Sequence, residues 1–255
     1  MTDDQSTVAT SVEGAVGTVL LDRPGDANAL DLATSQALGT AIAAMEADDA
    51  VRVVVLRGSG RVFCAGGDLA AMMDAPDRGA YLRELVDSAH VAVRAMQSLS
   101  KPLVVAVQGA AAGIGLSFAL GADVVVATES AKFVTAYTSV GLTPDGGMSW
   151  LLPRVVGQQR ALELLASGRP LSAASAQEWG IVSRLCADGA LDETVTEVAE
   201  SLAGRPTTAI GQARRLVRAS WERTLSEQLD AEADGISSIV ATEEAGERIA
   251  RFLKR

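Results

Sequence analysis

Four short runs of apolar, mostly branched residues stand out along the chain. They are Val16–Leu21, Val51–Leu56, Leu103–Val107 and Val124–Ala127, and branched residues of this kind favour β-strands. Because the runs are almost continuously hydrophobic, we expect both faces of each strand to be buried, as in a parallel sheet covered by helices. The pattern predicts an α/β protein.

Helical patterns lie between these strands. Residues Asp31–Glu46 open with a capping aspartate and carry apolar side chains at helical spacing. A second long helix is predicted over Arg78–Leu99, ending before Lys101-Pro102. The alternation of strands and helices predicts stacked βα units.

The last third of the chain has a different pattern. Strand signals fade from about residue 158, and from residue 189 the pattern is helical. The last three predicted helices alternate charged positions with apolar stripes, as a subunit-contact layer would; they are Pro206–Ser220, Leu225–Ile239 and Glu243–Leu253. We predict a core over residues 1–200 and a C-terminal helical oligomerisation region over residues 201–255.

Charge excludes several classes of partner. The 255 residues are 48% hydrophobic with a net charge of −10, and residues 1–50 contain nine acidic residues and one basic residue. Nucleic-acid binding needs the opposite sign, and no basic membrane-surface helix is visible. The uncharged stretch 102–122 contains Pro102, Gln108 and four glycines, which predict a strand, a turn and a helix rather than a membrane span. The acidic N-terminus lacks the order of a signal peptide, so we expect a cytoplasmic protein.

Cysteine and histidine content limits the chemistry. Cys64 and Cys186 cannot form a disulfide framework, and the single histidine, His90, disfavours metal sites and catalytic triads. We therefore predict no metal site and no redox cofactor.

Glycine is concentrated in three clusters at strand ends, over residues 63–68, 108–115 and 143–147. None has the lysine of a phosphate-binding P-loop, and no spaced glycine triplet follows the first strand. Glycines after a strand have another use, because they let backbone N–H groups approach a ligand closely.

Several motifs follow one another at defined distances along most of the chain. In order, they are Phe63-Cys64-Ala65-Gly66-Gly67-Asp68, Lys101-Pro102, Gln108-Gly109 with Gly113 and Gly115, Ala122-Asp123, Ala131-Lys132-Phe133, Gly141-Leu142, Gly146-Gly147 and Leu152-Pro153-Arg154. This order and spacing resembles the enoyl-CoA hydratase/isomerase (crotonase) superfamily. The resemblance implies an α/β superhelical spiral of ββα units with a helical C-terminal region. It also implies a homotrimer or a hexamer, and an acyl-CoA substrate whose coenzyme A replaces any separate cofactor.

The resemblance places two backbone N–H donors, at Gly67 and Ile114, against the carbonyl oxygen of a thioester. Negative charge builds on this oxygen when the thioester becomes enolate-like, and two preorganised donors stabilise that charge. The alternative is that these glycine segments only permit turns.

The resemblance also implies a binding surface for acyl-CoA. Backbone around Ala27 and Ala29, together with Ala65, would hold the adenine and pantetheine parts, and Arg23 would meet phosphate unless it is only a surface arginine. Lys254 resembles the terminal lysine that reaches a neighbouring subunit's CoA site. The remaining residues expected to contact substrate are Gly66, Asp68, Leu69, Gly113, Ser117 and Tyr137.

The acid/base residues distinguish the reactions of the family. Its hydratases use two glutamates, and here the corresponding positions are Ser117 and Tyr137. One carboxylate remains in the region, Asp145 in Pro144-Asp145-Gly146-Gly147, and this context resembles the phenylacetate-pathway isomerases of 1,2-epoxyphenylacetyl-CoA or enoyl-CoA. One base can remove a proton at one carbon and return it at another. The sequence thus favours an isomerase with Asp145 as the base, or, alternatively, Asp145 is only a helix N-cap.

Three other functions stay open. In aryl-CoA dehalogenases of the superfamily, a histidine placed like His90 activates water while an aspartate matching Asp145 is the nucleophile; otherwise His90 is an ordinary helix residue. Hydration of enoyl-CoA is a second possibility. The third is a non-catalytic acyl-CoA-binding protein, suggested by the loss of both glutamates.

Overall fold

The computed structural model describes residues 7–254 as two β-sheets wrapped by helices. The main sheet has the strand order β1-β2-β3-β4-β6-β9; β1 is antiparallel to β2 and the other neighbours are parallel. Its strands are β1 (Val8–Glu13), β2 (Val16–Leu21), β3 (Val53–Gly58), β4 (Leu103–Val107), β6 (Val124–Thr128) and β9 (Arg184–Cys186). A smaller sheet contains β5 (Ala110–Ala112), β7 (Lys132–Val134) and β8 (Leu171–Ser172).

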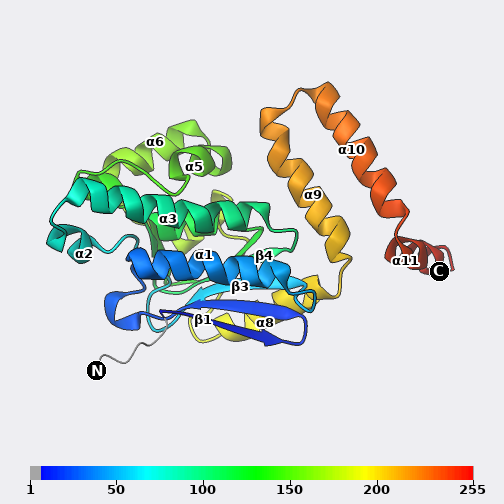
Figure 1. Ribbon diagram of the computed structural model, residues 1–255, viewed down its shortest axis with the longest axis horizontal. Helices are drawn as coiled ribbons and strands as arrows, with labels where there is room; N and C mark the ends of the chain where they lie inside the picture. Colours follow the sequence, from blue (N-terminus) through cyan, green and yellow to red (C-terminus); the bar gives the residue numbers. More distant parts are fainter. Residues whose placement is uncertain (1–6, 255) are drawn as a thin grey trace.

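Both faces of the central strands β3, β4 and β6 are buried, as the apolar runs predict, whereas in β2 only alternate residues are fully buried. In β3, Val54 and Leu56 point into the large core shared with α1 (Leu32–Ala47) and α3 (Arg78–Ser98). Val53 and Val55 point the other way, into a cluster closed by α8 (Leu191–Ala203). Figure 1 shows α1 and α3 on one side of the sheet and α8 on the other.

The other helices connect the strands or follow them. They are α2 (Leu69–Asp74), α4 (Ile114–Leu120), α5 (Met148–Val156), α6 (Gln158–Ser167), α7 (Ala173–Glu178), α9 (Thr207–Ala219), α10 (Leu225–Val240) and α11 (Glu243–Leu253). Three short 3-10 helices are η1 (Pro24–Asp26), η2 (Tyr137–Val140) and η3 (Ser220–Glu222). Asp31 caps α1 as predicted, since its carboxylate accepts from the Thr34 N–H at 2.7 Å.

Of the strands within residues 7–254, sequence analysis missed β1, β5, β7, β8 and β9. The outer strand β1 exposes most of its side chains, and the other four have only two or three residues each, so none of them forms a long apolar run. The strand predicted from Val51 begins at Val53, because Val51 instead closes a turn onto the carbonyl of Asp48. The uncharged stretch 102–122 forms β4, β5 and α4, and no helix within residues 7–254 is long and apolar enough to span a membrane. The acidic start, residues 1–6, lies outside the described residues.

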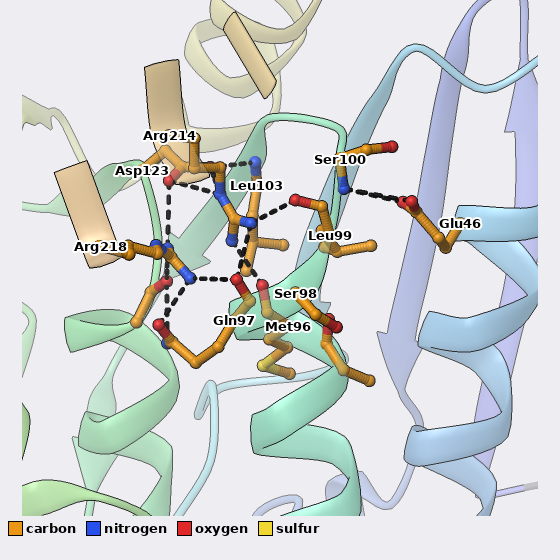
Figure 2. Close-up of polar contacts among 12 residues, drawn as sticks. Glu46, Met96, Gln97, Ser98, Leu99, Ser100, Leu103, Asp123, Arg214 and Arg218 are labelled. Atoms are coloured by element: carbon orange, nitrogen blue, oxygen red, sulfur yellow. Dashed lines mark hydrogen bonds and ion pairs between the residues drawn. The ribbon is translucent and has the colours of Figure 1, made fainter. Parts of the chain in front are cut away.

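Two arginines of α9 attach the C-terminal helices to the core (Figure 2). Arg214 is buried; it bonds the Asp123 carboxylate at 2.8 Å and the main-chain carbonyls at the end of α3. Arg218 donates to Asp123 at 3.1 Å and to the carbonyl of Gly121, after α4, at 2.6 Å. Carbonyls at helix C-termini have no partner within the helix, so the two cations cap α3 and α4. Beyond this contact, α10 runs back alongside α9 (Figure 1), and Glu244 of α11 pairs with Arg52, before β3, at 3.6 Å.

Candidate active site

A cavity of about 350 Å³ lies between α3 and the glycine-rich loops. Its walls come from the loop before α2, the start of α4, η2 and the loop that follows η2. The predicted site residues that line it are Ala65, Gly66, Gly67, Asp68, Leu69, Gly113, Ile114, Tyr137 and Asp145. The structure therefore brings segments far apart in the sequence to one enclosed space.

Two glycine loops approach each other closely at the base of the cavity. The chain around Cys64 pairs with the β5 segment, since the Cys64 N–H donates to Ala110 at 3.1 Å and the Ala112 N–H donates back to Cys64 at 2.9 Å. A side chain on Gly113 would begin 3.5 Å from the Cα of Gly66, and Gly66 has a φ of +107°. This conformation favours glycine, which explains why both loops are glycine-rich.

The close approach places the Gly67 and Ile114 N–H groups at the same cavity. Ile114 is the first residue of α4, so its N–H has no acceptor inside the helix. Over residues 7–254, neither N–H donates to a protein acceptor. Two free main-chain donors on one cavity are what an oxyanion hole requires.

Asp145 is a partly buried carboxylate that caps no helix. The N-cap of α5 is Gly147, which has no side-chain cap, and the Met148 N–H bonds the main-chain oxygen of Asp145 at 2.9 Å. The carboxylate Oδ1 instead accepts from the Tyr137 hydroxyl at 2.6 Å. Burial raises the pKa of Asp145 above its usual value, and the Tyr137 hydrogen bond offsets part of this rise. A raised pKa suits a general base.

Tyr137 is the donor in this pair. Its side chain is 8% exposed. Burial and the neighbouring negative charge of Asp145 raise the pKa of Tyr137, so the phenol stays protonated and keeps donating. The preceding residue, Ala136, has a φ of +63° and also lines the cavity. A non-glycine residue in this conformation is strained, and such strain is concentrated at functional sites.

His90 lies on the α3 wall of the same cavity. Its Nε2 accepts a hydrogen bond from the Gly146 N–H at 3.1 Å. The single histidine of the chain is therefore connected to the loop that carries Asp145.

The predicted CoA-binding backbone forms a continuous patch beside the cavity. The Ala65 N–H donates to the carbonyl of Ala27 at 3.1 Å. Arg23 bonds the carbonyl of Ala29 at 2.7 Å and pairs with Asp68 at 3.1 Å; it also pairs with Asp26 and Asp31. The guanidinium of Arg23 is thus held by three carboxylates within the chain.

Two predicted site residues lie elsewhere. Ser117 is 2% exposed and sits inside α4 behind Gly146, outside the cavity lining. Lys254 follows α11, which Figure 1 shows at the opposite end of the molecule from α2.

The individual residues of the cavity's apolar wall were not named by the sequence analysis. This wall consists mainly of one face of α3 with contributions from α2 and η2: Met72, Leu82, Leu85, Val86, Ala89 and Val140. The spacing of the α3 residues, with His90 continuing the stripe, is the helical period of three to four. That periodicity was a usable signal, but it does not distinguish a cavity wall from a packed core.

A larger groove, about 740 Å³, lies between the β1–β2 hairpin and α8. Its most prominent charged pair is Arg57 with Asp192, at 2.5 Å. Its lining includes none of Gly67, Ile114 and Asp145, so the smaller cavity is the candidate active site.

The chain is similar to known proteins over most of its length. The family model for enoyl-CoA hydratase/isomerase matches residues 11–255. Over 232 residues the chain is 39% identical to the 1,2-epoxyphenylacetyl-CoA isomerase of Escherichia coli, covering 89% of this chain and 87% of that protein. It is 33% identical to 4-chlorobenzoyl coenzyme A dehalogenase-2 of an Arthrobacter species, covering 93% and 87%. The crystal structure of an enoyl-CoA hydratase from a Polaromonas species superposes with a TM-score of 0.91 at 34% identity, covering 97% and 96%.

The fold is that of a crotonase-type protein. The chain belongs to the enoyl-CoA hydratase/isomerase family. The predicted fold class and family are thereby confirmed, whereas the relatives include an isomerase, hydratases and a dehalogenase.

Proposed function

We propose that this protein isomerises an enoyl-CoA or ring-epoxide acyl-CoA thioester, with Asp145 as the only acid/base. For an enoyl-CoA with its double bond between carbons 3 and 4, Asp145 takes a proton from carbon 2. The Gly67 and Ile114 N–H groups hold the negative oxygen of the resulting dienolate. Asp145 then returns the proton at carbon 4, which leaves the double bond between carbons 2 and 3.

A single observation carries this proposal: the cavity holds one available carboxylate. Asp68 also lines it, but its carboxylate caps α2 through the Ala71 N–H at 3.0 Å and pairs with Arg23. The Ala71 hydrogen bond, with that of Arg23, lowers the pKa of Asp68, so it is a weak base. Only Asp145 combines burial with a raised pKa among the carboxylates lining the cavity. A pair of carboxylates that positions water for hydration is not present there.

A panel of acyl-CoA thioesters tests the proposal. Each thioester is followed for double-bond migration and for hydration. We expect migration to dominate for at least one substrate of the panel. Fast hydration of crotonyl-CoA, at the rate of a two-glutamate enzyme, would refute the choice of reaction.

Tyr137→Phe should move the pH dependence of the reaction. The phenol stabilises the ionised form of Asp145, so its loss raises the pKa of Asp145 further. A hydrogen bond to a charged group is worth about 1.5–3 kcal/mol, or roughly one to two pH units. The acid limb of the kcat profile should therefore shift to higher pH. Tyr81→Phe, the same change at the chain's other tyrosine, should leave the limb in place.

Proton exchange separates catalysis from passive binding. An enolising enzyme exchanges the hydrogens next to the thioester carbonyl in heavy water, and a non-catalytic binding protein does not. The unpaired N–H groups of Gly67 and Ile114 and the raised pKa of Asp145, on the lining of one cavity, support exchange.

The assembly we propose is a homotrimer or a hexamer, working in the cytoplasm with coenzyme A only as part of the substrate. Exposed apolar side chains along the C-terminal helices support it; they include Leu225, Ile236, Phe252 and Leu253, each at least 71% exposed. Sedimentation should show a trimer or a hexamer. A stable monomer at micromolar concentration contradicts this assembly.

A further inference from the structure

His90 holds the Asp145 loop by accepting a hydrogen bond. The Gly146 N–H donates to His90 Nε2 at 3.1 Å. A neutral imidazole has one protonated nitrogen and one acceptor. When Nε2 accepts from Gly146, the ring hydrogen is on Nδ1, and no lone pair remains for taking a proton from water. In this arrangement, His90 is not a base.

Gly146 connects His90 with both Asp145 and the start of α4. It directly follows Asp145, and its φ of +58° brings its backbone against the first turn of α4. A β-carbon on Gly146 would lie 2.6 Å from Cγ1 of Ile114 and 3.2 Å from Oγ of Ser117. Gly146 therefore fills the space between the carboxylate loop and the residue that supplies one of the two free N–H groups.

We infer that His90 is a positioning residue, which fixes Gly146 and thereby sets the distance between the Asp145 carboxylate and the oxyanion donors. The inference rests on the proposed function, because it assumes that Asp145 moves the proton. It also predicts that His90 acts only as the hydrogen-bond acceptor of the Gly146 N–H. Another acceptor at the same position should therefore replace the imidazole. Such a role argues against water activation by His90.

Two variants of matched size test the inference. His90→Gln keeps an acceptor oxygen at about the reach of Nε2, whereas His90→Leu removes it. The Leu variant should lose about 10-fold to 100-fold in kcat, since a lost hydrogen bond and a misplaced group have effects of this order. Its KM should change much less. The Gln variant should recover most of the kcat.

Hydrogen exchange at the Gly146 amide provides a readout that does not depend on catalysis. The Gly146 amide hydrogen should be protected from exchange in the wild type and in His90→Gln. Its protection should be lower in His90→Leu. If the Leu variant does not fold, His90→Asn, whose amide is too short to reach Gly146, takes its place.

Three results would overturn the inference. One is a Gln variant as inactive as the Leu variant, because the imidazole itself would then act chemically. The others are an unchanged kcat or an unchanged Gly146 protection in the Leu variant. Asp145→Asn, measured in parallel, separates the two proposals. Activity that survives in Asp145→Asn refutes the proposed function, whereas an inactive Asn variant beside unaffected His90 variants refutes only the role of His90.

Discussion

Asp145→Asn should reduce kcat by about 10²–10⁴, the usual effect of losing a positioned acid/base. Asparagine has nearly the same volume and still accepts from the Tyr137 hydroxyl, but it cannot take a proton. Because the carboxylate caps no helix, the free energy of unfolding should change by less than about 1 kcal/mol. Affinity for an acyl-CoA should persist, since the Gly67 and Ile114 backbones are untouched. Steady-state kinetics, thermal unfolding and ligand titration measure the three quantities.

Ser117→Ala is the control for this variant. Ser117 is buried next to the same loop but does not line the cavity, so its loss should cost much less activity. If Asp145→Asn stays near full activity while Tyr137→Phe or His90→Gln is inactive, the base lies elsewhere.

Gly146→Ala should reduce kcat by about 10²-fold, the effect expected when reacting groups are displaced by about an ångström. The new methyl group would lie 2.6 Å from Cγ1 and 3.0 Å from Cδ1 of Ile114. Either the Asp145 loop or the start of α4 must move to relieve this contact. Kinetics together with unfolding measurements separate the loss of rate from any loss of stability.

Gly14→Ala is the matched control, because Gly14 has a φ of +59° and nothing within 4 Å of the added carbon. The Gly14→Ala variant has the backbone strain of about 1–2 kcal/mol without the steric contact. Its kcat should equal that of the wild type. Adding Ile114→Ala to the Gly146→Ala variant removes the obstructing side-chain atoms and keeps the main-chain N–H of residue 114. The double variant should therefore recover part of the lost kcat. A Gly146→Ala variant that is as active as Gly14→Ala would show that this contact does not set the geometry.

Local sequence patterns were sufficient to predict the central strands and the first helix. The apolar runs gave β2 and β4 with their bounds, and the capping aspartate gave the start of α1. The glycine clusters indicated where backbone N–H groups meet a ligand. Short strands such as β9 were missed because their pairing depends on a neighbour far away in the chain.

The details of the site depend on tertiary contacts that no sequence pattern displays. Asp145 had two interpretations, and its position beside Tyr137 rather than at a helix start excludes the helix cap. The bond between His90 and Gly146 joins residues 56 positions apart. The three ion pairs of Arg23, with Asp26, Asp31 and Asp68, likewise depend on the folded chain.

The most direct test of a one-carboxylate isomerase follows solvent atoms into the product. The wild-type enzyme is incubated with an enoyl-CoA substrate in ¹⁸O-labelled heavy water, and the thioester is analysed by mass spectrometry. Isomerisation by Asp145 predicts a shifted double bond and no ¹⁸O, with solvent deuterium at carbon 4 only to the extent that the Asp145 proton exchanges with solvent before it is returned. A hydrated or hydroxylated thioester that carries ¹⁸O as the main product would contradict the account.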